Sequence, residues 1–298
     1  MKSKLFLSGV FLLLLCLSGE CNDLSKSKIQ RFQVDGKNRE YLLHIPKNLP
    51  ENAALVFVLH GYTDHAQNMM NTTEMNKIAD KNGFAVCYPQ GLTDERGNTF
   101  WEVGYTFTQS KKVDDVNFLS ELAVHLQNEF KLSSQNTFAT GMSNGGDMSI
   151  MLACEAPEVF KAVAPVCGCM MKCNFEACNS TKPIPVFLIN STADSTTYWN
   201  GDMLDKQGWG AYLPVKENLD FWIKKNLCTS IVTDTVPDID KNDRSYVITE
   251  KYSSTKNGNQ VWFYKVVNGG HDWPGYSGNK DINASQEVWN FFSLFIKP

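Results

Sequence analysis

Short apolar segments typical of buried β-strands alternate with amphipathic helical segments along most of this 298-residue chain. Residues 55–59 are a continuous apolar run, which suits a strand covered on both faces. Apolar residues recur at helical spacing over residues 115–130. Further strands are expected at residues 84–88, 137–140, 162–166, 186–189 and 261–267, and further helices at 148–156, 215–225 and 284–296. This alternation predicts the α/β class, a mostly parallel central sheet with helices on both faces.

The first two predicted strands form a hairpin rather than a parallel pair. Residues 29–34 and 39–45 are joined through Asp35 and Gly36, a dipeptide typical of tight hairpin turns. With 43% hydrophobic and 20% charged residues, the chain can bury a sizeable core, which excludes a largely disordered chain. We see no Pro/Ser-rich linker after the hairpin begins, so residues 19–298 are predicted to form a single domain.

The first residues have the order of a secretory signal peptide. Lys2 and Lys4 precede an apolar run over residues 5–17, and small residues starting at Ser18 follow. The run is shorter than the ~20 residues that a membrane-spanning helix needs. We therefore predict a signal peptide over residues 1–18 and a secreted protein, extracellular or periplasmic, without stable membrane association. An uncleaved membrane anchor is the alternative.

Nine cysteines fit an exported chain, in which disulfides are the leading expectation. We expect at least two disulfides, involving the cluster from Cys167 to Cys178 and Cys228. The same cluster could be considered for zinc, but it lacks the paired C-x₂-C spacing of zinc sites, so no metal site is predicted. Cys87 and Cys154 fall inside apolar segments and fit buried thiols.

A Gly-x-Ser-x-Gly motif runs from Gly141 to Gly145, directly after the strand predicted at residues 137–140 and before a helical run. In this context the serine sits in a strained, tight turn with its hydroxyl exposed at the end of the strand. The glycines remove side chains that would collide where strand and helix pack. The motif predicts Ser143 as a nucleophile, with an ordinary glycine-rich turn as the alternative.

A nucleophilic serine needs a base and an orienting acid. Where such a turn carries the nucleophile, the acid and then the histidine follow it in the chain, and His271 is the only histidine after Ser143. Asp194 follows the strand predicted at residues 186–189 and is the predicted acid, with Asp202 and Asp205 as alternatives. The acid would hold the histidine in the right tautomer and stabilise the imidazolium.

Two backbone N–H groups are expected to form an oxyanion hole, which stabilises the negative oxygen of an acyl-transfer intermediate. The first would come from Asn144, directly after the nucleophile, and the second from Tyr62, in the loop after His60 and Gly61. A simple turn at the end of the strand is the alternative for this loop.

Taken together, these residues resemble the esterase family named for polyhydroxybutyrate depolymerase, which also holds secreted feruloyl and acetylxylan esterases. The resemblance implies an α/β-hydrolase fold and a Ser143, Asp194 and His271 triad, with no metal or organic cofactor. The family commonly has His-Gly-Thr-x-Asp followed by Val-Pro at the acid; here residues 190–199 differ, so the pocket wall beside Asp194 is altered. The matching motifs are residues 59–61, 88–91, 114–118, 141–146, 157–166 and 271–274.

These observations favour a secreted serine carboxylesterase that cleaves soluble esters, above all feruloyl or acetyl esters on plant-type polysaccharide. Trp199 and Trp273, near the acid and the base, are predicted to stack on substrate rings. The alternatives are a polyhydroxybutyrate or oligoester depolymerase, a serine peptidase, and a non-catalytic carbohydrate-binding protein on a hydrolase scaffold. Depolymerases of insoluble polyester usually carry an added binding module, and none is evident after the last predicted helix.

The expected partner is a small-molecule or oligosaccharide ester. The formal charge is −4, and acidic and basic residues are mixed along the chain. Nucleic acid or an anionic membrane would need a Lys/Arg-rich face, so the charge pattern argues against both.

Overall fold

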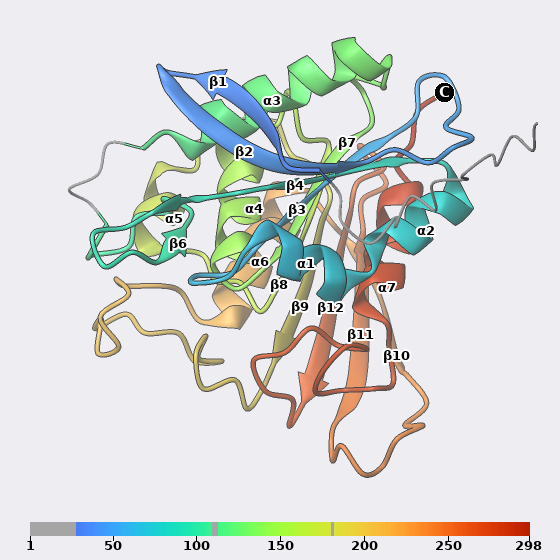
Figure 1. Ribbon diagram of the computed structural model, residues 1–298. Helices are drawn as coiled ribbons and strands as arrows, with labels where there is room; N and C mark the ends of the chain where they lie inside the picture. Colours follow the sequence, from blue (N-terminus) through green and yellow to red (C-terminus); the bar gives the residue numbers. More distant parts are fainter. Residues whose placement is uncertain (1–27, 109–112, 180–181) are drawn as a thin grey trace, which may run out of the picture.

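A ten-stranded sheet with helices on both faces forms the centre of the computed structural model, which describes residues 28–108, 113–179 and 182–298 (Figure 1). The strand order is β1-β2-β4-β3-β7-β8-β9-β12-β11-β10. Neighbours from β4 to β12 in this order run parallel, and the outer strands pair antiparallel. The strands are β1 (Gln30–Val34), β2 (Lys37–His44), β3 (Leu55–Leu59), β4 (Ala85–Pro89), β7 (Thr137–Met142), β8 (Ala162–Val166), β9 (Val186–Ser191), β10 (Ser230–Thr235), β11 (Tyr246–Ser253) and β12 (Gln260–Val267). A separate small sheet pairs β5 (Leu92–Thr93) with β6 (Thr99–Phe100).

Two hydrophobic cores lie on the two faces of the sheet. Successive side chains of a strand point to opposite faces, so Leu55 and Phe57 of β3 enter one core and Val56 and Val58 enter the other. One core is covered by α3 (Asp115–Phe130), α4 (Asn144–Glu155) and α6 (Val215–Lys225), and the other by α1 (Ala66–Thr73), α2 (Met75–Asn82) and α7 (Ala284–Ser293).

The predicted α/β architecture is confirmed, including the opening hairpin. Asp35 and Gly36 both have positive φ, as a tight two-residue turn between β1 and β2 requires. The structure adds elements that the sequence pattern did not indicate, among them β10, β11 and the short helices α1, α2 and α5 (Lys172–Ala177). All six residues of β10 are exposed, so no apolar alternation marks this strand.

The disulfide expectation is partly corrected. Within the described residues one disulfide forms, between Cys154 and Cys178, and it ties the end of α4 to the segment after α5. The interpretation of Cys154 as a free buried thiol was therefore wrong. Cys167 and Cys228 are free, against our expectation, and the Cys167 thiol instead lies 3.4 Å from the carbonyl oxygen of Asp272.

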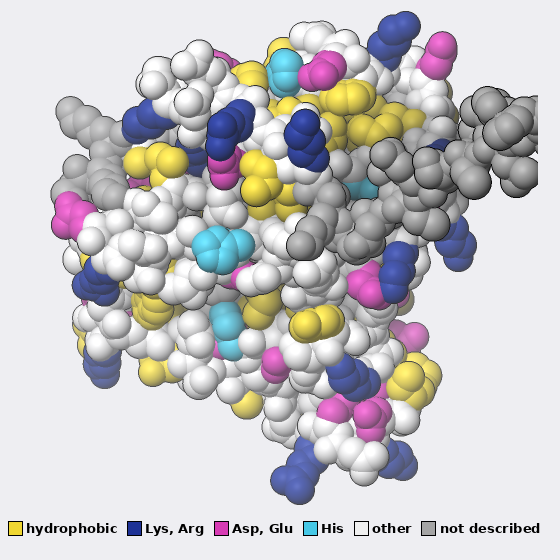
Figure 2. Space-filling model, viewed as in Figure 1, with side chains coloured by type: hydrophobic (Ala, Val, Ile, Leu, Met, Phe, Trp, Pro, Cys, Tyr) yellow, Lys and Arg dark blue, Asp and Glu magenta, His cyan; other side chains and the backbone are white. Residues whose placement is uncertain are grey.

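Two observations concern the predicted partners: the distribution of charge on the surface, and the length and hydrophobicity of the helices. On the face drawn in Figure 2, basic and acidic side chains are interspersed. Among the residues that the structure describes, no helix is long and apolar enough to cross a membrane. The predicted signal peptide, residues 1–18, lies outside those residues.

Candidate active site

Ser143 occupies a sharp turn between β7 and α4. Its backbone has a positive φ of 54° with ψ −122°, a conformation that is costly for a residue with a side chain. The turn is fixed because the Ser143 N–H donates to the carbonyl oxygen of Val166 on β8, at 2.9 Å. This is the strained strand-to-helix turn expected of Gly-x-Ser-x-Gly, and it lies at the carboxyl end of the parallel strands.

The glycines of the motif are required by close packing of backbone. A Cβ on Gly145 would lie 2.3 Å from the carbonyl oxygen of Leu59, and a Cβ on Gly141 would lie 2.6 Å from the backbone of Gly145. Both distances are far below ordinary van der Waals contact, so a larger side chain would push β3, β7 and α4 apart. The motif is thus a steric requirement of this turn.

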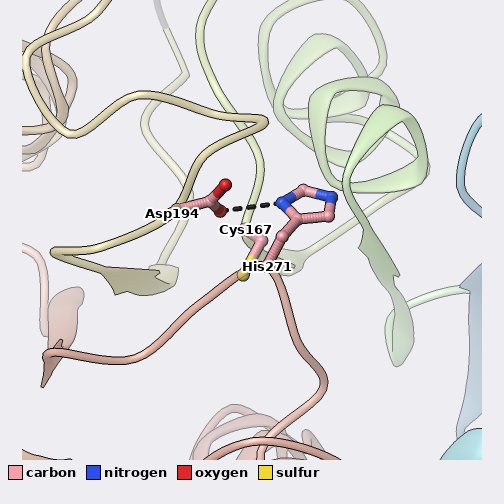
Figure 3. A group of neighbouring side chains, drawn as sticks. All are labelled: Cys167, Asp194 and His271. Atoms are coloured by element: carbon pink, nitrogen blue, oxygen red, sulfur yellow. Dashed lines mark hydrogen bonds and ion pairs between the residues drawn. The ribbon is translucent and has the colours of Figure 1, made fainter.

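His271 and Asp194 meet across 77 positions of sequence (Figure 3). They follow β12 and β9, which are neighbours in the sheet, and His271 Nδ1 lies 2.7 Å from Asp194 Oδ2. The other carboxylate oxygen accepts the backbone N–H groups of Thr196 and Thr197, each at 2.8 Å. Because a carboxylate accepts hydrogen bonds, His271 Nδ1 is the donor in this contact and Nε2 is left with its lone pair.

The alternative acids have other partners. Asp202 accepts the backbone N–H of Gln207. Asp205 accepts the N–H of Gly210 and the hydroxyl of Thr106. Of the three candidates, Asp194 is the one that the fold brings to His271.

The loop after β3 is held against the serine turn by His60. Burial lowers the pKa of His60 to about 4, so this histidine is neutral. Its Nδ1–H donates to the carbonyl oxygen of Gly61, and its Nε2 accepts the N–H of Gly91. Gly61 packs so closely that its Cβ would lie 3.6 Å from that of Ser143. The loop that carries the backbone of Tyr62 therefore lies beside the serine.

Trp101 and Asn144 connect the loop after β3 to the start of α4 through hydrogen bonds. The Asn144 side chain accepts the backbone N–H of Trp101 and donates to its carbonyl oxygen. The Trp101 indole N–H donates to the carbonyl oxygen of His60. Since both side chains are fully buried, they fix the first residue of α4 relative to the loop after β3.

A pocket opens directly at Ser143. Its walls are largely aromatic, and its lining residues are Tyr62, Tyr105, Ser143, Asp147, Cys169, Thr196, Thr197, Trp209 and Tyr212. The rings of Tyr62, Tyr105 and Phe107 all lie 5.3–5.5 Å from the ring of Trp209, so these aromatic side chains form one contiguous cluster.

The two tryptophans expected to bind substrate lie elsewhere. Trp273 is buried in the core under α7, where its indole N–H donates to the hydroxyl of Ser285. Trp199 is half-buried against Phe263, with Lys265 over its ring. Neither lines the pocket at Ser143. The aromatic wall comes instead from the loops that carry Tyr62, Tyr105, Trp209 and Tyr212.

Asp147 is a pocket residue that the sequence analysis did not identify. Its carboxylate accepts the hydroxyl of Tyr105 at 2.7 Å and the N–H of Cys169 at 2.6 Å. Burial raises the pKa of Asp147 to about 6, although the hydrogen bonds from Tyr105 and Cys169 act to lower it. Its position in the first turn of α4, just after Ser143, was the available signal. A carboxyl group that changes charge near neutral pH therefore lies in the pocket.

Asp147→Asn is expected to change the pH dependence of stability. The pKa of Asp147 is about 6 in the folded chain and 3.8 ordinarily, so the folded state binds the proton more tightly. Rising pH therefore destabilises the wild-type fold from about pH 4, and this loss levels off above about pH 6, at roughly 3 kcal/mol. Relative to wild type, the variant should gain about 1–3 kcal/mol in unfolding free energy between pH 4 and pH 8.

Urea unfolding of both proteins across this pH range measures the difference. The amide also replaces one acceptor oxygen, which adds a cost in unfolding free energy that does not depend on pH. The assignment is therefore tested by how the difference in unfolding free energy between the two proteins changes with pH. A difference in unfolding free energy that stays constant from pH 4 to pH 8 would contradict the assignment.

Comparisons with known proteins found a family model and several relatives that match this chain. The family model described as Esterase PHB depolymerase matches residues 40–200, more than half of the chain. The chain is 26% identical over 159 residues to a bifunctional acetylxylan esterase/xylanase, XynS20E, of Neocallimastix patriciarum, covering 53% of this chain and 22% of that protein. It is 25% identical over 223 residues to feruloyl esterase B of Piromyces equi, covering 74% and 39%. The chain thus spans well under two thirds of the length of these relatives.

A solved structure matches over nearly the whole fold. The acetyl xylan esterase from Aspergillus awamori superimposes with a TM-score of 0.63 and 16% identity, covering 90% of this chain and 99% of that chain. This likeness shows that the two chains share the α/β-hydrolase fold.

Proposed function

Because this chain belongs to the Esterase PHB depolymerase family, we propose that it is a serine carboxylic-ester hydrolase with Ser143, Asp194 and His271 as its triad. The observation that carries the proposal is the 2.7 Å contact between His271 Nδ1 and Asp194, formed at the same sheet edge as the strained turn of Ser143. The hydroxyl of a strained turn serine, a neutral imidazole and an ionised carboxylate are the parts needed for acyl transfer.

In this mechanism Ser143 Oγ attacks the ester carbonyl carbon. His271 Nε2 takes the serine proton and then gives it to the leaving alcohol, which leaves an acyl group on the serine. A water molecule, activated by the same histidine, releases the acid. Asp194 keeps Nδ1 protonated and stabilises the imidazolium that forms in each step.

The oxyanion would be held by the backbone N–H groups of Asn144 and Tyr62. The hydrogen bonds among Asn144, Trp101 and His60 support this assignment because they hold both backbone segments in place before substrate arrives. Such preorganised donors stabilise the charge that develops in the transition state, commonly by about 3–4 kcal/mol for each donor.

The proposed substrates are soluble esters, above all acetyl or feruloyl esters on plant-type polysaccharide. The aromatic cluster around Trp209 supports this choice, since aromatic faces stack well on sugar and phenolic rings. We further propose that residues 1–18 direct export and are removed, leaving residues 19–298 as a secreted catalytic domain. The Cys154–Cys178 disulfide is consistent with an oxidising compartment.

A substrate panel tests the proposal. We expect kcat/KM for acetylated xylo-oligosaccharide or methyl ferulate to exceed that for a hydroxybutyrate trimer and for a long-chain p-nitrophenyl ester by at least about tenfold, or 1.4 kcal/mol of transition-state discrimination. The measurement is initial rates across the four esters with one enzyme preparation. A peptide panel run beside them should give no cleavage above that of the Ser143→Ala variant.

Each other outcome selects a different function. A hydroxybutyrate trimer that leads by tenfold would favour an oligoester depolymerase. Cleavage of peptides in preference to esters would favour a peptidase. Absence of turnover on all of them, together with binding of xylo-oligosaccharide, would indicate a carbohydrate-binding protein on a hydrolase scaffold.

A further inference from the structure

A free thiol lies beside the Asp194–His271 pair. Cys167 directly follows β8, its side chain is fully buried, and it takes no part in the disulfide of the described residues. The Cys167 sulfur, a carboxylate oxygen of Asp194 and a ring nitrogen of His271 all lie within 4.8 Å of one another (Figure 3). The acyl-transfer mechanism proposed above gives this thiol no role.

The three side chains offer the ligand types that zinc prefers. Zinc binds cysteine sulfur at about 2.3 Å, histidine nitrogen at about 2.0–2.1 Å and carboxylate oxygen at about 2.0–2.2 Å. On a tetrahedral ion these bond lengths place two ligand atoms about 3.4–3.6 Å apart. The separations around Cys167 are at most 4.8 Å, so side-chain movements of about 1 Å bring all three atoms onto one ion.

The surroundings favour a cation and allow it to enter. The Asp194 carboxylate is already oriented by the N–H groups of Thr196 and Thr197. The side chain of His271 is 19% exposed, which opens the cluster on the histidine side, whereas that of Asp194 is only 2% exposed. A partly exposed histidine over two buried ligands forms a site with a solvent-facing position.

We propose that Cys167, Asp194 and His271 form an inhibitory site for soft divalent cations of the zinc and cadmium class. The proposal rests on the proposed function, because the same Asp194–His271 pair serves catalysis there. When the cation binds, the Cys167 thiol releases its proton to solvent and the metal takes the place of the proton on His271 Nδ1. The proton displaced from Nδ1 goes to solvent and Nε2 takes one up from solvent, so Nε2 can no longer accept the proton of Ser143. Binding and catalysis are mutually exclusive, and inhibition is reversible.

The test is inhibition of the full-length enzyme, freed of metal with EDTA and desalted. Initial rates on p-nitrophenyl acetate are measured against zinc and cadmium chloride, with magnesium chloride as a hard-cation control, and each rate is divided by that protein's own metal-free rate. Zinc and cadmium should inhibit, EDTA should restore the rate, and magnesium should have no effect, because hard cations prefer oxygen ligands.

The variants Cys167→Ser and Cys167→Ala identify the site, and Cys228→Ser is the matched control, since Cys228 is also a free cysteine. Loss of even an outer-shell partner lowers metal affinity by about 10–100-fold, so loss of the thiolate should raise the zinc inhibition constant at least about tenfold. The Cys228→Ser variant should be inhibited like wild type. Equal inhibition of wild type and both Cys167 variants, or no inhibition of wild type by millimolar zinc, would overturn the proposal.

A second readout does not depend on turnover. Cadmium bound to a thiolate produces an ultraviolet charge-transfer band, which should appear in wild type and in Cys228→Ser and should weaken in both Cys167 variants. Should the wild-type enzyme hydrolyse no ester, the proposed function fails, yet this band still decides the metal site. A band of equal strength in wild type and the Cys167 variants would refute the site whatever the esterase assay gives.

Discussion

Replacing Ser143 or His271 with alanine is expected to lower kcat by about 10⁶, because nucleophile and base act as one unit and either loss removes the whole pathway. The residual rate should come from the oxyanion donors and from binding alone. Steady-state turnover of p-nitrophenyl acetate measures the effect, with circular dichroism as the check that each variant is folded.

A matched control is available for the histidine. His44 lies on β2, where its Nε2 is 2.8 Å from the exposed carboxylate of Asp80, far from Ser143 in the sheet order. His44→Ala should turn over at nearly the wild-type rate. Comparable losses of kcat in His44→Ala and His271→Ala would show that the loss in His271→Ala reflects general damage to the fold. A His271→Ala variant that keeps more than about one per cent of wild-type activity would exclude this histidine as the base.

Asp194→Asn is expected to lower kcat by about 10⁴, less than the loss of the nucleophile or the base. An amide nitrogen facing Nδ1 would donate a hydrogen bond to it and leave the proton on Nε2, the wrong tautomer for taking the proton of Ser143. The measurement is kcat on the same ester, with KM expected to change little because Asp194 acts through His271.

Asp202→Asn is the control for this variant. Asp202 lies in the same long loop, but its carboxylate accepts the backbone N–H of Gln207 and does not contact His271. Its kcat should stay within a few fold of wild type. Full activity in Asp194→Asn together with a large loss in Asp202→Asn would show that the acid is misassigned.

The sheet and the nucleophile turn could be predicted because their signals are local. Continuous apolar runs mark the buried parallel strands, and Gly141 and Gly145 flank the serine where no Cβ fits. His271 could be chosen because it is the only histidine after Ser143, and Asp194 because it follows a strong strand. The strand, turn and acid inferences use residues within one element and its end, and the choice of His271 uses only the order of residues along the chain.

The remaining features depend on contacts between distant segments. Burial raises the pKa of Asp147, a pocket residue whose carboxylate is reached by Tyr105 and Cys169 from two other loops. Trp273 lies two positions from His271, yet its side chain turns into the core to reach Ser285. The closeness of Trp273 to His271 in sequence predicted that it would contact substrate. Its packing against α7 keeps it in the core instead.

The cysteines illustrate the same limit. Cys154 and Cys178 are separated by 24 positions, and only the fold of α4 and α5 brings them to bonding distance. Cys167 lies in the cluster expected to form disulfides, but the end of β8 directs its side chain toward Asp194 and His271 instead. Spacing along the chain could predict an oxidised protein but not the partners of each thiol.

The positive φ of Ser143 brings thermal stability and turnover into conflict at a single residue. A residue with a side chain in such a conformation costs about 1–3 kcal/mol, and glycine would relieve much of this cost. The more stable chain is thus an inactive one, so directed evolution that screens only for heat resistance would favour loss of the nucleophile. Libraries built on this protein need to be scored for turnover and heat resistance together.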